Sequence, residues 1–439
     1  MLKIYTELFA ELEKNKVDYC IYKGLNHLDE DLNGNRGDID VLIDNNNLSD
    51  FENILNSNNF KKDMKKNFPI YYFGIDEETD KYVMVDIDNK IRLGEKPYRP
   101  YFYLIDIHEL KKELRNNVWV LADEDYIPLM FFQRTTALAP KQKDLIELQT
   151  LLVNENAIQN EYACSILENI LDTSWEDIEK DIINAEDWDI LQKKYKTKIL
   201  KSVKVDYTLL FQQKFQKIIN LVKRVKNKLF KVPPYKIRKQ GYLVAFIGVD
   251  GAGKSSTIDY LLGLDYFKIT GIKRVYFGNN EYWIPGVVWG LKNAKNRWLK
   301  MFFALLAHAD RSLRSLIAYY YVKRGFIVVA DRFYYDNFVG QEMTKNDTKP
   351  TKSIFKKFYR YIFKPRIWIN PDITIFLDVH PDVAYSRKQD YSYEMMLVVN
   401  KAYKDYMLTV NNVVIVNANN DQDVIYNEVM SHILKLDNR

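Results

Sequence analysis

The stretch Tyr242–Leu262, YLVAFIGVDGAGKSSTIDYLL, decides the fold of the C-terminal half. The apolar run Tyr242–Ile247 predicts a buried strand, and Ile258–Leu262 is typical of a helix. Between them, Gly248 to Ser255 fits the pattern G-x-x-x-x-G-K-[ST] at every fixed position. A strand, a glycine-rich turn and a helix in this order predict a phosphate-binding loop.

The loop combines the residue types that polyphosphate binding requires. Its glycines let backbone N–H groups close around phosphates at a helix N-terminus. Lys254 would place a positive charge on the β and γ phosphates, and the Ser255 hydroxyl would ligate Mg²⁺. The alternative is a purely structural turn. The predicted ATP-binding residues are Gly248, Asp250, Gly251, Ala252, Gly253, Lys254, Ser255 and Ser256.

Two later strands of the C-terminal half end in acidic residues. Phe326–Ala330 leads into Asp331 and Arg332, and Ile373–Leu377 leads into Asp378. Open α/β sheets bind ligands at the carboxyl ends of their strands, so either aspartate could hold Mg²⁺ through water. Either could instead cap the helix that follows, and the spacing does not choose between them.

The order of these motifs resembles that of the thymidylate kinase family. The resemblance implies an ATP-dependent phosphotransferase in which Asp331 and Arg332 serve Mg²⁺ and the acceptor phosphate. It also implies that Arg311 contacts the acceptor, and that Arg387 with Lys388 begins the catalytic lid. The matching stretches are Gly248–Ser255, Ala307–Arg311, Asp331–Phe333 and Pro371–Asp378.

The chain departs from that family on the acceptor side. Val275–Asn280 stands where an Arg-Glu-Pro-Gly type segment usually shapes the thymidylate site. Glu281–Leu306 and Ser353–Asn370 look like extra or altered segments. We therefore expect the ATP side to be retained and the acceptor to differ from dTMP.

The N-terminal part contains two pairs of aspartates on predicted strands. Asp38 and Asp40 lie two residues apart on one predicted strand and so share a face of the sheet. Asp86 and Asp88 end another predicted strand. Three such carboxylates converging from neighbouring strands are suited to hold two Mg²⁺ for nucleotidyl transfer.

This arrangement resembles the nucleotidyltransferase superfamily related to DNA polymerase β. The resemblance implies that Asp38 and Asp40 ligate metal, with Asp86 a better third ligand than Asp88. It includes the turn Lys23-Gly24 and the predicted helix Leu138–Leu152. An inactive relic that binds a nucleotide or partner, and a plain solvated acidic face, are the alternatives.

Charge and composition divide the chain. Residues 1–200 hold 25 Lys and Arg against 39 Asp and Glu, whereas residues 201–439 hold 39 against 20. We predict a nucleotidyltransferase-like α/β domain over 1–125 and a helical extension over 126–207. A basic amphipathic helix and linker would cover 208–240, and a P-loop kinase with a parallel sheet flanked by helices would cover 241–439. The two cysteines, Cys20 and Cys164, are too few for a disulfide framework and are expected to be buried.

Three segments combine cations with large apolar side chains. A membrane surface or lipid-linked acceptor would suit them, nucleic acid would suit them less well, and docking on the kinase core is the plain alternative. No run of apolar residues reads as a signal peptide or a membrane span, so we expect a cytoplasmic protein. The basic segments leave open a location at the periphery of the membrane. The segments are Lys214–Lys231, Trp283–Phe303 and Ile354–Trp368.

Together these patterns predict a bifunctional Mg²⁺-dependent transferase with ATP as a substrate. One half would phosphorylate a small acceptor and the other would add a nucleoside monophosphate, as in assembly of a surface polysaccharide. The rival hypotheses are a thymidylate kinase with an inactive N-terminal domain and a nucleotide-sensing regulatory or defence protein.

Overall fold

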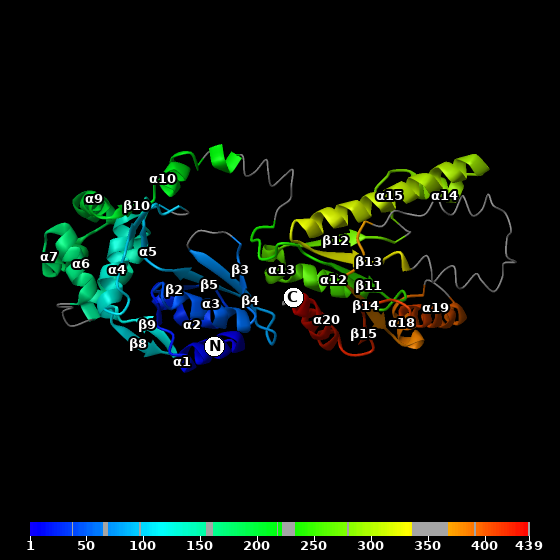
Figure 1. Cartoon of the computed structure of the whole chain (residues 1–439), viewed down its shortest axis with the longest axis horizontal. Helices are drawn as coiled ribbons and strands as arrows, with labels where there is room; N and C mark the ends of the chain where they lie inside the picture. The colour runs from blue at the N-terminus through cyan, green and yellow to red at the C-terminus, as the bar shows by residue number, and fades with distance from the viewer. Residues whose placement is uncertain are drawn as a thin grey trace. The chain divides into compact units, whose positions relative to one another are not determined.

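The structure is a computed structural model that describes residues 1–36, 38–64, 69–95, 98–154, 161–216, 218–221, 233–278, 281–335, 368–389 and 392–437. The chain divides into two compact units, Met1–Lys231 and Val232–Arg439, drawn blue to green and green to red in Figure 1. Each unit contains its own β-sheet.

The first unit is built on a mixed seven-stranded sheet of order β3-β4-β5-β2-β1-β9-β8, with a smaller sheet of order β10-β7-β6. The predicted strand of Asp38 and Asp40 is confirmed as β2, and the one that Asp86 and Asp88 end is confirmed as β5. Strands β6 to β9 were not predicted, because three or four residues are too few for alternation to show. The strands are β1 (Tyr19–Ile21), β2 (Asp38–Ile43), β3 (Lys61–Lys62), β4 (Ile70–Ile75), β5 (Tyr82–Asp88), β6 (Ile91–Leu93), β7 (Tyr101–Tyr103), β8 (Lys112–Arg115), β9 (Val118–Leu121) and β10 (Lys204–Val205).

Helices precede, interrupt and follow these strands, and the predicted helical extension is confirmed as a run of helices from α4 onward. A 3₁₀ turn (Leu25–His27) and a π-helical turn (Gln192–Lys196) complete the unit. The helices are α1 (Lys3–Lys14), α2 (Leu28–Leu32), α3 (Leu48–Ser57), α4 (Asp123–Thr136), α5 (Gln142–Asn154), α6 (Tyr162–Leu171), α7 (Trp175–Asn184), α8 (Trp188–Leu191), α9 (Thr197–Ser202) and α10 (Tyr207–Lys214).

Ser49 and Glu52 form a capping-box pattern, which predicts that a helix starts at Ser49. The helix begins at Leu48, so Ser49 lies inside its first turn, and the N-cap residue Asn47 makes no side-chain cap. The carboxylate of Asp44 accepts a hydrogen bond from the Asn47 amide at 3.1 Å instead. The helix was therefore predicted correctly, but its cap was assigned to the wrong residue.

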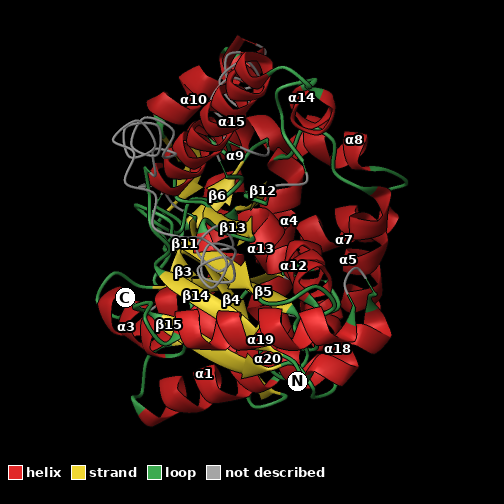
Figure 2. Cartoon of the chain, turned by 90° about the vertical axis from the view of Figure 1, so that its right-hand side faces the viewer, coloured by secondary structure: helices red, strands yellow, loops and turns green. Residues whose placement is uncertain are grey.

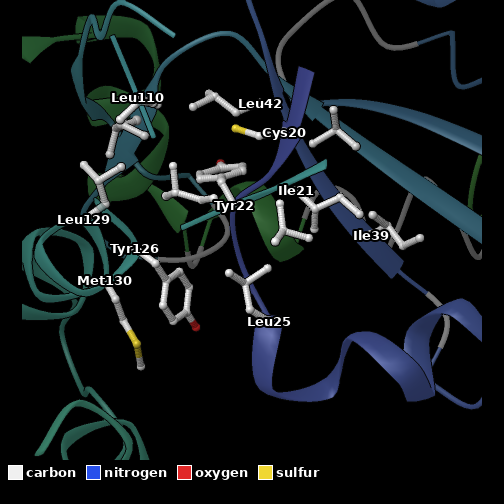
Figure 3. Close-up of a cluster of buried hydrophobic side chains, with 14 of the residues drawn as sticks. Cys20, Ile21, Tyr22, Leu25, Ile39, Leu42, Leu110, Tyr126, Leu129 and Met130 are labelled. Atoms are coloured by element: carbon white, nitrogen blue, oxygen red, sulfur yellow. The ribbon is translucent and has the colours of Figure 1, made fainter. Parts of the chain in front are cut away.

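One continuous apolar core fills the first unit. Figure 3 shows part of it, where Cys20 and Tyr22 lie near Tyr126 and Leu129 of α4. Cys20 and Cys164 are 0% and 1% exposed, as expected. Burial raises the pKa of the Cys20 thiol to about 12, so this side chain behaves as a small apolar residue.

The second unit contains a five-stranded sheet of order β12-β13-β11-β14-β15, in which every pair is parallel. Strand β11 pairs with β13 on one side and β14 on the other, so the chain connections reverse at its carboxyl end. Ligands bind at such a switch point in open parallel sheets. The strands are β11 (Leu243–Ile247), β12 (Ile272–Tyr276), β13 (Ile327–Asp331), β14 (Ile373–Asp378) and β15 (Val413–Asn417).

Helices flank this sheet, which confirms the predicted α/β class; they are red and the strands yellow in Figure 2. Both α12 and α15 pack against β12 and β13, and α20 packs against α12 and β15. The helices are α12 (Lys254–Gly263), α13 (Asp265–Thr270), α14 (Val287–Asn293), α15 (Arg297–Lys323), α18 (Pro381–Arg387), α19 (Tyr393–Met407) and α20 (Gln422–Asp437).

An ion pair joins the beginning of the second unit to its end. The guanidinium of Arg238 donates two hydrogen bonds to the carboxylate of Asp437, the last residue of α20, and a third to the Thr270 carbonyl at 3.2 Å. Both side chains of the pair are at most 7% exposed. The geometry leaves neither charge unpaired.

The predicted basic segments are only partly described. Helix α10 ends at Lys214, residues 216 and 218–221 are helical again after a turn at Phe215, and residues 222–231 lie outside the described residues. The segment Ile354–Trp368 also lies outside them, except for Trp368. None of the described helices has the length and apolarity that a membrane crossing requires.

Candidate functional site

The loop after β11 has a backbone that only glycine can adopt at its centre. Gly251 has φ +86°, and a Cβ atom there would lie 2.4 Å from the Ala384 carbonyl oxygen of α18. Gly253, which precedes α12, has φ +90°. L-residues with side chains rarely adopt these angles, so the glycines are required by the turn itself.

Lys254 reaches back across this loop. Its ammonium donates hydrogen bonds of 2.8 Å to the carbonyls of Gly248 and Val249, and it lies 3.9 Å from the Asp250 carboxylate. The residue is 7% exposed. A buried cation at the mouth of a turn of backbone amides is suited to attract a polyphosphate.

A cavity of about 1070 Å³ opens beside the loop. Predicted residues from three separate parts of the chain line it: Lys254 and Ser255, then Asp331 and Arg332, then Arg387. Gly248 does not line it, and neither does Arg311. Asp378 pairs with Lys404 of α19 at 2.9 Å, so Asp331 is the strand-end carboxylate that faces the cavity.

Asp331 and Arg332 are each held by an ion pair. Asp331 is 4% exposed and pairs with Arg274 of β12, which also contacts Asp259 at 2.9 Å. Arg332 pairs with Asp250 of the loop. Its φ of 65° is uncommon for a residue with a side chain and directs the chain away from the end of β13.

The cavity fits a magnesium ion whose coordination shell is completed by the phosphates of a substrate. Among the residues that the structure describes, no group of three or more His, Cys, Asp or Glu could hold a metal. Mg²⁺ in phosphotransferases is usually bound by one or two protein oxygens, with phosphates and water as the other ligands. Ser255 and Asp331, which line the same cavity, supply that donor set.

Arg311 lies behind the cavity wall instead of in it. Its guanidinium donates to the Tyr282 hydroxyl at 2.9 Å and stacks 5.7 Å from that ring. The residue is 9% exposed. The neighbours of Tyr282, Glu281 and Trp283, line the cavity, so Arg311 supports its wall through Tyr282.

Two residues of α15 that the sequence did not single out fix this wall. The Asp310 carboxylate accepts hydrogen bonds from the amides of Trp283 and Ile284 at 2.7 and 2.9 Å. Arg314 pairs with Asp310 at 2.6 Å, and both side chains are fully buried. Arg314 also donates to the carbonyls of Tyr276 and Glu281, each at 2.7 Å. The signal available in the sequence was the i, i+4 spacing of opposite charges on one helix.

His308, on the same helix, should make the stability of the second unit depend on pH. Burial, and then the nearby Arg311, lower the pKa of its imidazole to about 4. An unfolded histidine binds a proton near pH 6.5, so the unfolded chain takes up the proton first as the pH falls. We expect the stability of the second unit to decrease from pH 7 to pH 4, and less steeply in His308→Gln. Hydrogen exchange of α15 peptides at both pH values would measure this, and equal slopes for the two proteins would contradict it.

The first unit places two of its predicted carboxylates side by side. Strands β2 and β5 are parallel, with Asp40 opposite Asp86 and Asp38 opposite Met84. Burial, followed by Asp40 and Asp38, raises the pKa of Asp86 to about 8, and its Oδ1 atom has no hydrogen-bond partner among the described residues. Asp88 instead accepts from Tyr22 at 3.0 Å and Arg92 at 2.6 Å.

The predicted cluster of three metal-binding carboxylates is not assembled in this structure. No described group of three acids meets the requirement for a metal site. The ammonium of Lys23 lies 2.8 Å from Asp40 and 3.7 Å from Asp88, so a protein cation neutralises this corner. A divalent cation would still suit this place, because it would relieve the repulsion between Asp40 and Asp86 and bind the unpartnered Oδ1 atom of Asp86.

The second unit is similar to known proteins. The thymidylate kinase family model matches residues 246–429. A probable thymidylate kinase of Staphylothermus marinus is 27% identical over 205 residues, which are 44% of this chain and 96% of that protein. The thymidylate kinase of Mycoplasmoides gallisepticum is 23% identical over 209 residues, 44% and 95% of the two chains.

Among solved structures, deoxyadenosine kinase from M. mycoides with bound dATP is 18% identical. That match has a TM-score of 0.32 and covers 44% of this chain and 98% of the kinase. The family match and the relatives show that the C-terminal half is similar to thymidylate kinases. The family match lies wholly within the second unit.

Proposed function

We propose that the C-terminal unit transfers the γ-phosphoryl group of ATP to a small acceptor other than dTMP. The observation that carries this proposal is the cavity that brings Lys254 and Ser255 together with Asp331 and Arg332. Lys254, Asp331 and Arg332 supply the charges that phosphoryl transfer requires, and Ser255 supplies a hydroxyl ligand for the metal.

The chain's own groups would act by positioning and charge neutralisation. Loop amides and Lys254 hold the β and γ phosphates, and Arg332 and Arg387 balance charge on the transferring group. Ser255 and Asp331 would hold Mg²⁺, which would supply positive charge to the phosphates. The acceptor oxygen attacks the γ phosphorus in line, the bond to the β-phosphate oxygen breaks, and ADP leaves.

The acceptor side supports a substrate different from dTMP. Tyr276 and Glu281, whose carbonyls Arg314 holds, line the cavity with Trp283. An indole, a phenol and a carboxylate form a wall that can stack on a ring and accept hydrogen bonds from hydroxyl groups. A nucleoside or sugar hydroxyl acceptor fits this wall.

For the N-terminal unit we propose transfer of a nucleoside monophosphate, with Asp38, Asp40 and Asp86 holding Mg²⁺. The support is the register that sets Asp40 beside Asp86, and a cavity of about 500 Å³ lined by Asp38 and Asp40. Coupled to the kinase, this unit would activate the phosphorylated product, as surface polysaccharide assembly needs. A thymidylate kinase with an inactive first unit and a nucleotide sensor are the rival hypotheses.

A double substitution separates the two activities. In Asp38→Asn/Asp40→Asn we expect label transfer from α-³²P nucleotides to fall by about 100-fold or more, since the metal-binding charge is lost. Transfer from γ-³²P ATP should stay unchanged. Thin-layer chromatography of products formed with sugar phosphates and nucleoside monophosphates as acceptors measures both.

The matched control is Asp50→Asn/Glu176→Gln, which removes two carboxylates of the same unit that do not line the cavity. Equal α-label transfer by the two double variants would refute nucleotidyl transfer at this site. No γ-label transfer by the wild-type protein to any acceptor would refute the kinase proposal instead.

A further inference from the structure

The cavity of the first unit carries more positive charge than its acidic surroundings suggest. Residues 1–200 are acidic overall, yet seven Lys or Arg line this cavity against five Asp or Glu. The cavity has a volume of about 500 Å³, within the range of small-molecule sites.

Four of the seven cations already have acidic partners. Lys23 pairs with Asp40, and Arg92 pairs with Asp88 at 2.6 Å. Arg134 lies 3.1 Å from Asp144, and Arg36 lies 3.6 Å from Glu30. These pairs hold the walls of the cavity and leave little charge for a ligand.

The other three, Arg99, Lys141 and Lys143, form no ion pair with any described residue and line the same cavity. Arg99 comes from the segment between β6 and β7, and both lysines lie at the start of the 13-residue helix α5. Arg99 also has a φ of 42°, a left-handed conformation that costs energy for an arginine. Cations from two distant segments therefore converge on one space near a helix N-terminus, which itself attracts anions.

We propose that Arg99, Lys141 and Lys143 form a binding site for a phosphate group of a small-molecule ligand. Phosphate fits because its oxygens accept hydrogen bonds from a guanidinium and from ammonium groups at once. The ligand is a phosphomonoester acceptor or the polyphosphate of a nucleotide. This site deepens the nucleotidyl-transfer proposal, since Asp38 and Asp40 line the same cavity.

The test is isothermal titration of the full chain, with Lys254→Ala in every protein to weaken the phosphate loop of the second unit. The probes are glycerol 3-phosphate, a phosphomonoester, and inorganic pyrophosphate, which stands for a nucleotide polyphosphate. We expect saturable binding that weakens about tenfold or more in Lys141→Ala/Lys143→Ala, because each charge-assisted hydrogen bond contributes roughly a factor of ten.

The control, Lys193→Ala/Lys201→Ala, removes the same charge from exposed residues of the same unit that do not line the cavity. Loss of glycerol 3-phosphate binding identifies the acceptor as the source, and loss of pyrophosphate binding alone identifies the nucleotide. The proposal is overturned if neither probe saturates, or if the two double variants bind equally. Binding retained in Asp38→Asn/Asp40→Asn with transfer lost separates this site from the transfer chemistry.

Discussion

Replacing Lys254 by alanine is expected to lower the rate of γ-phosphoryl transfer by about 10²- to 10³-fold, the usual cost of removing one preorganised charge that stabilises the transition state. The ammonium lies at the mouth of the glycine-rich loop, hydrogen-bonded to the carbonyls of Gly248 and Val249. A phosphate can take over those hydrogen bonds as it enters. Steady-state kinetics with γ-³²P ATP would measure the loss.

Lys268→Ala is the matched control. Lys268 belongs to the same unit, is exposed, and pairs with Asp265 on α13 away from the cavity. Its activity should equal that of the wild-type protein. Unchanged kinetics in Lys254→Ala, with circular dichroism showing a folded chain, would exclude this loop as the phosphate site.

Replacing Asp310 by alanine is expected to destabilise the second unit by about 3–5 kcal/mol, because it leaves the fully buried Arg314 without its counter-charge. It also leaves the amides of Trp283 and Ile284 without their acceptor. Hydrogen exchange by mass spectrometry should show faster exchange in peptides of α15. Peptides of the first unit provide an internal reference.

Two further variants test whether the unpaired charge of Arg314 causes the destabilisation. Asp405→Ala removes an exposed carboxylate from α19 and should change nothing. Asp310→Leu/Arg314→Met removes both charges and should cost less than Asp310→Ala alone, since no buried charge remains unpaired. If Asp310→Ala exchanges like Asp405→Ala, the ion pair does not stabilise the wall of the cavity.

The phosphate loop was predictable because its signal is local. Strand, turn and helix follow one another within Tyr242–Leu262. Each glycine there has a positive φ angle that the local turn requires. The convergence of Asp331 with this loop was also predictable, since parallel strands end at the same edge of a sheet. These parts of the site required no knowledge of side-chain packing.

Contacts between residues far apart in the sequence could not be predicted from the sequence. Arg314 contacts the Tyr276 carbonyl 38 positions away, and Arg274 contacts Asp331 57 positions away. Nothing in a linear pattern specifies which of many cations will meet which carboxylate. The same holds for Lys23, whose pairing with Asp40 was not predictable from the sequence pattern.

The Arg238–Asp437 pair bears on whether the second unit can be fused to other domains. It brings the first described segment of that unit into contact with the end of α20, so the chain enters and leaves this fold at neighbouring positions. Modules with adjacent ends can be inserted into a host loop or circularly permuted with little disturbance. We therefore expect that a different domain fused upstream of Arg238 leaves the fold of this unit unaltered.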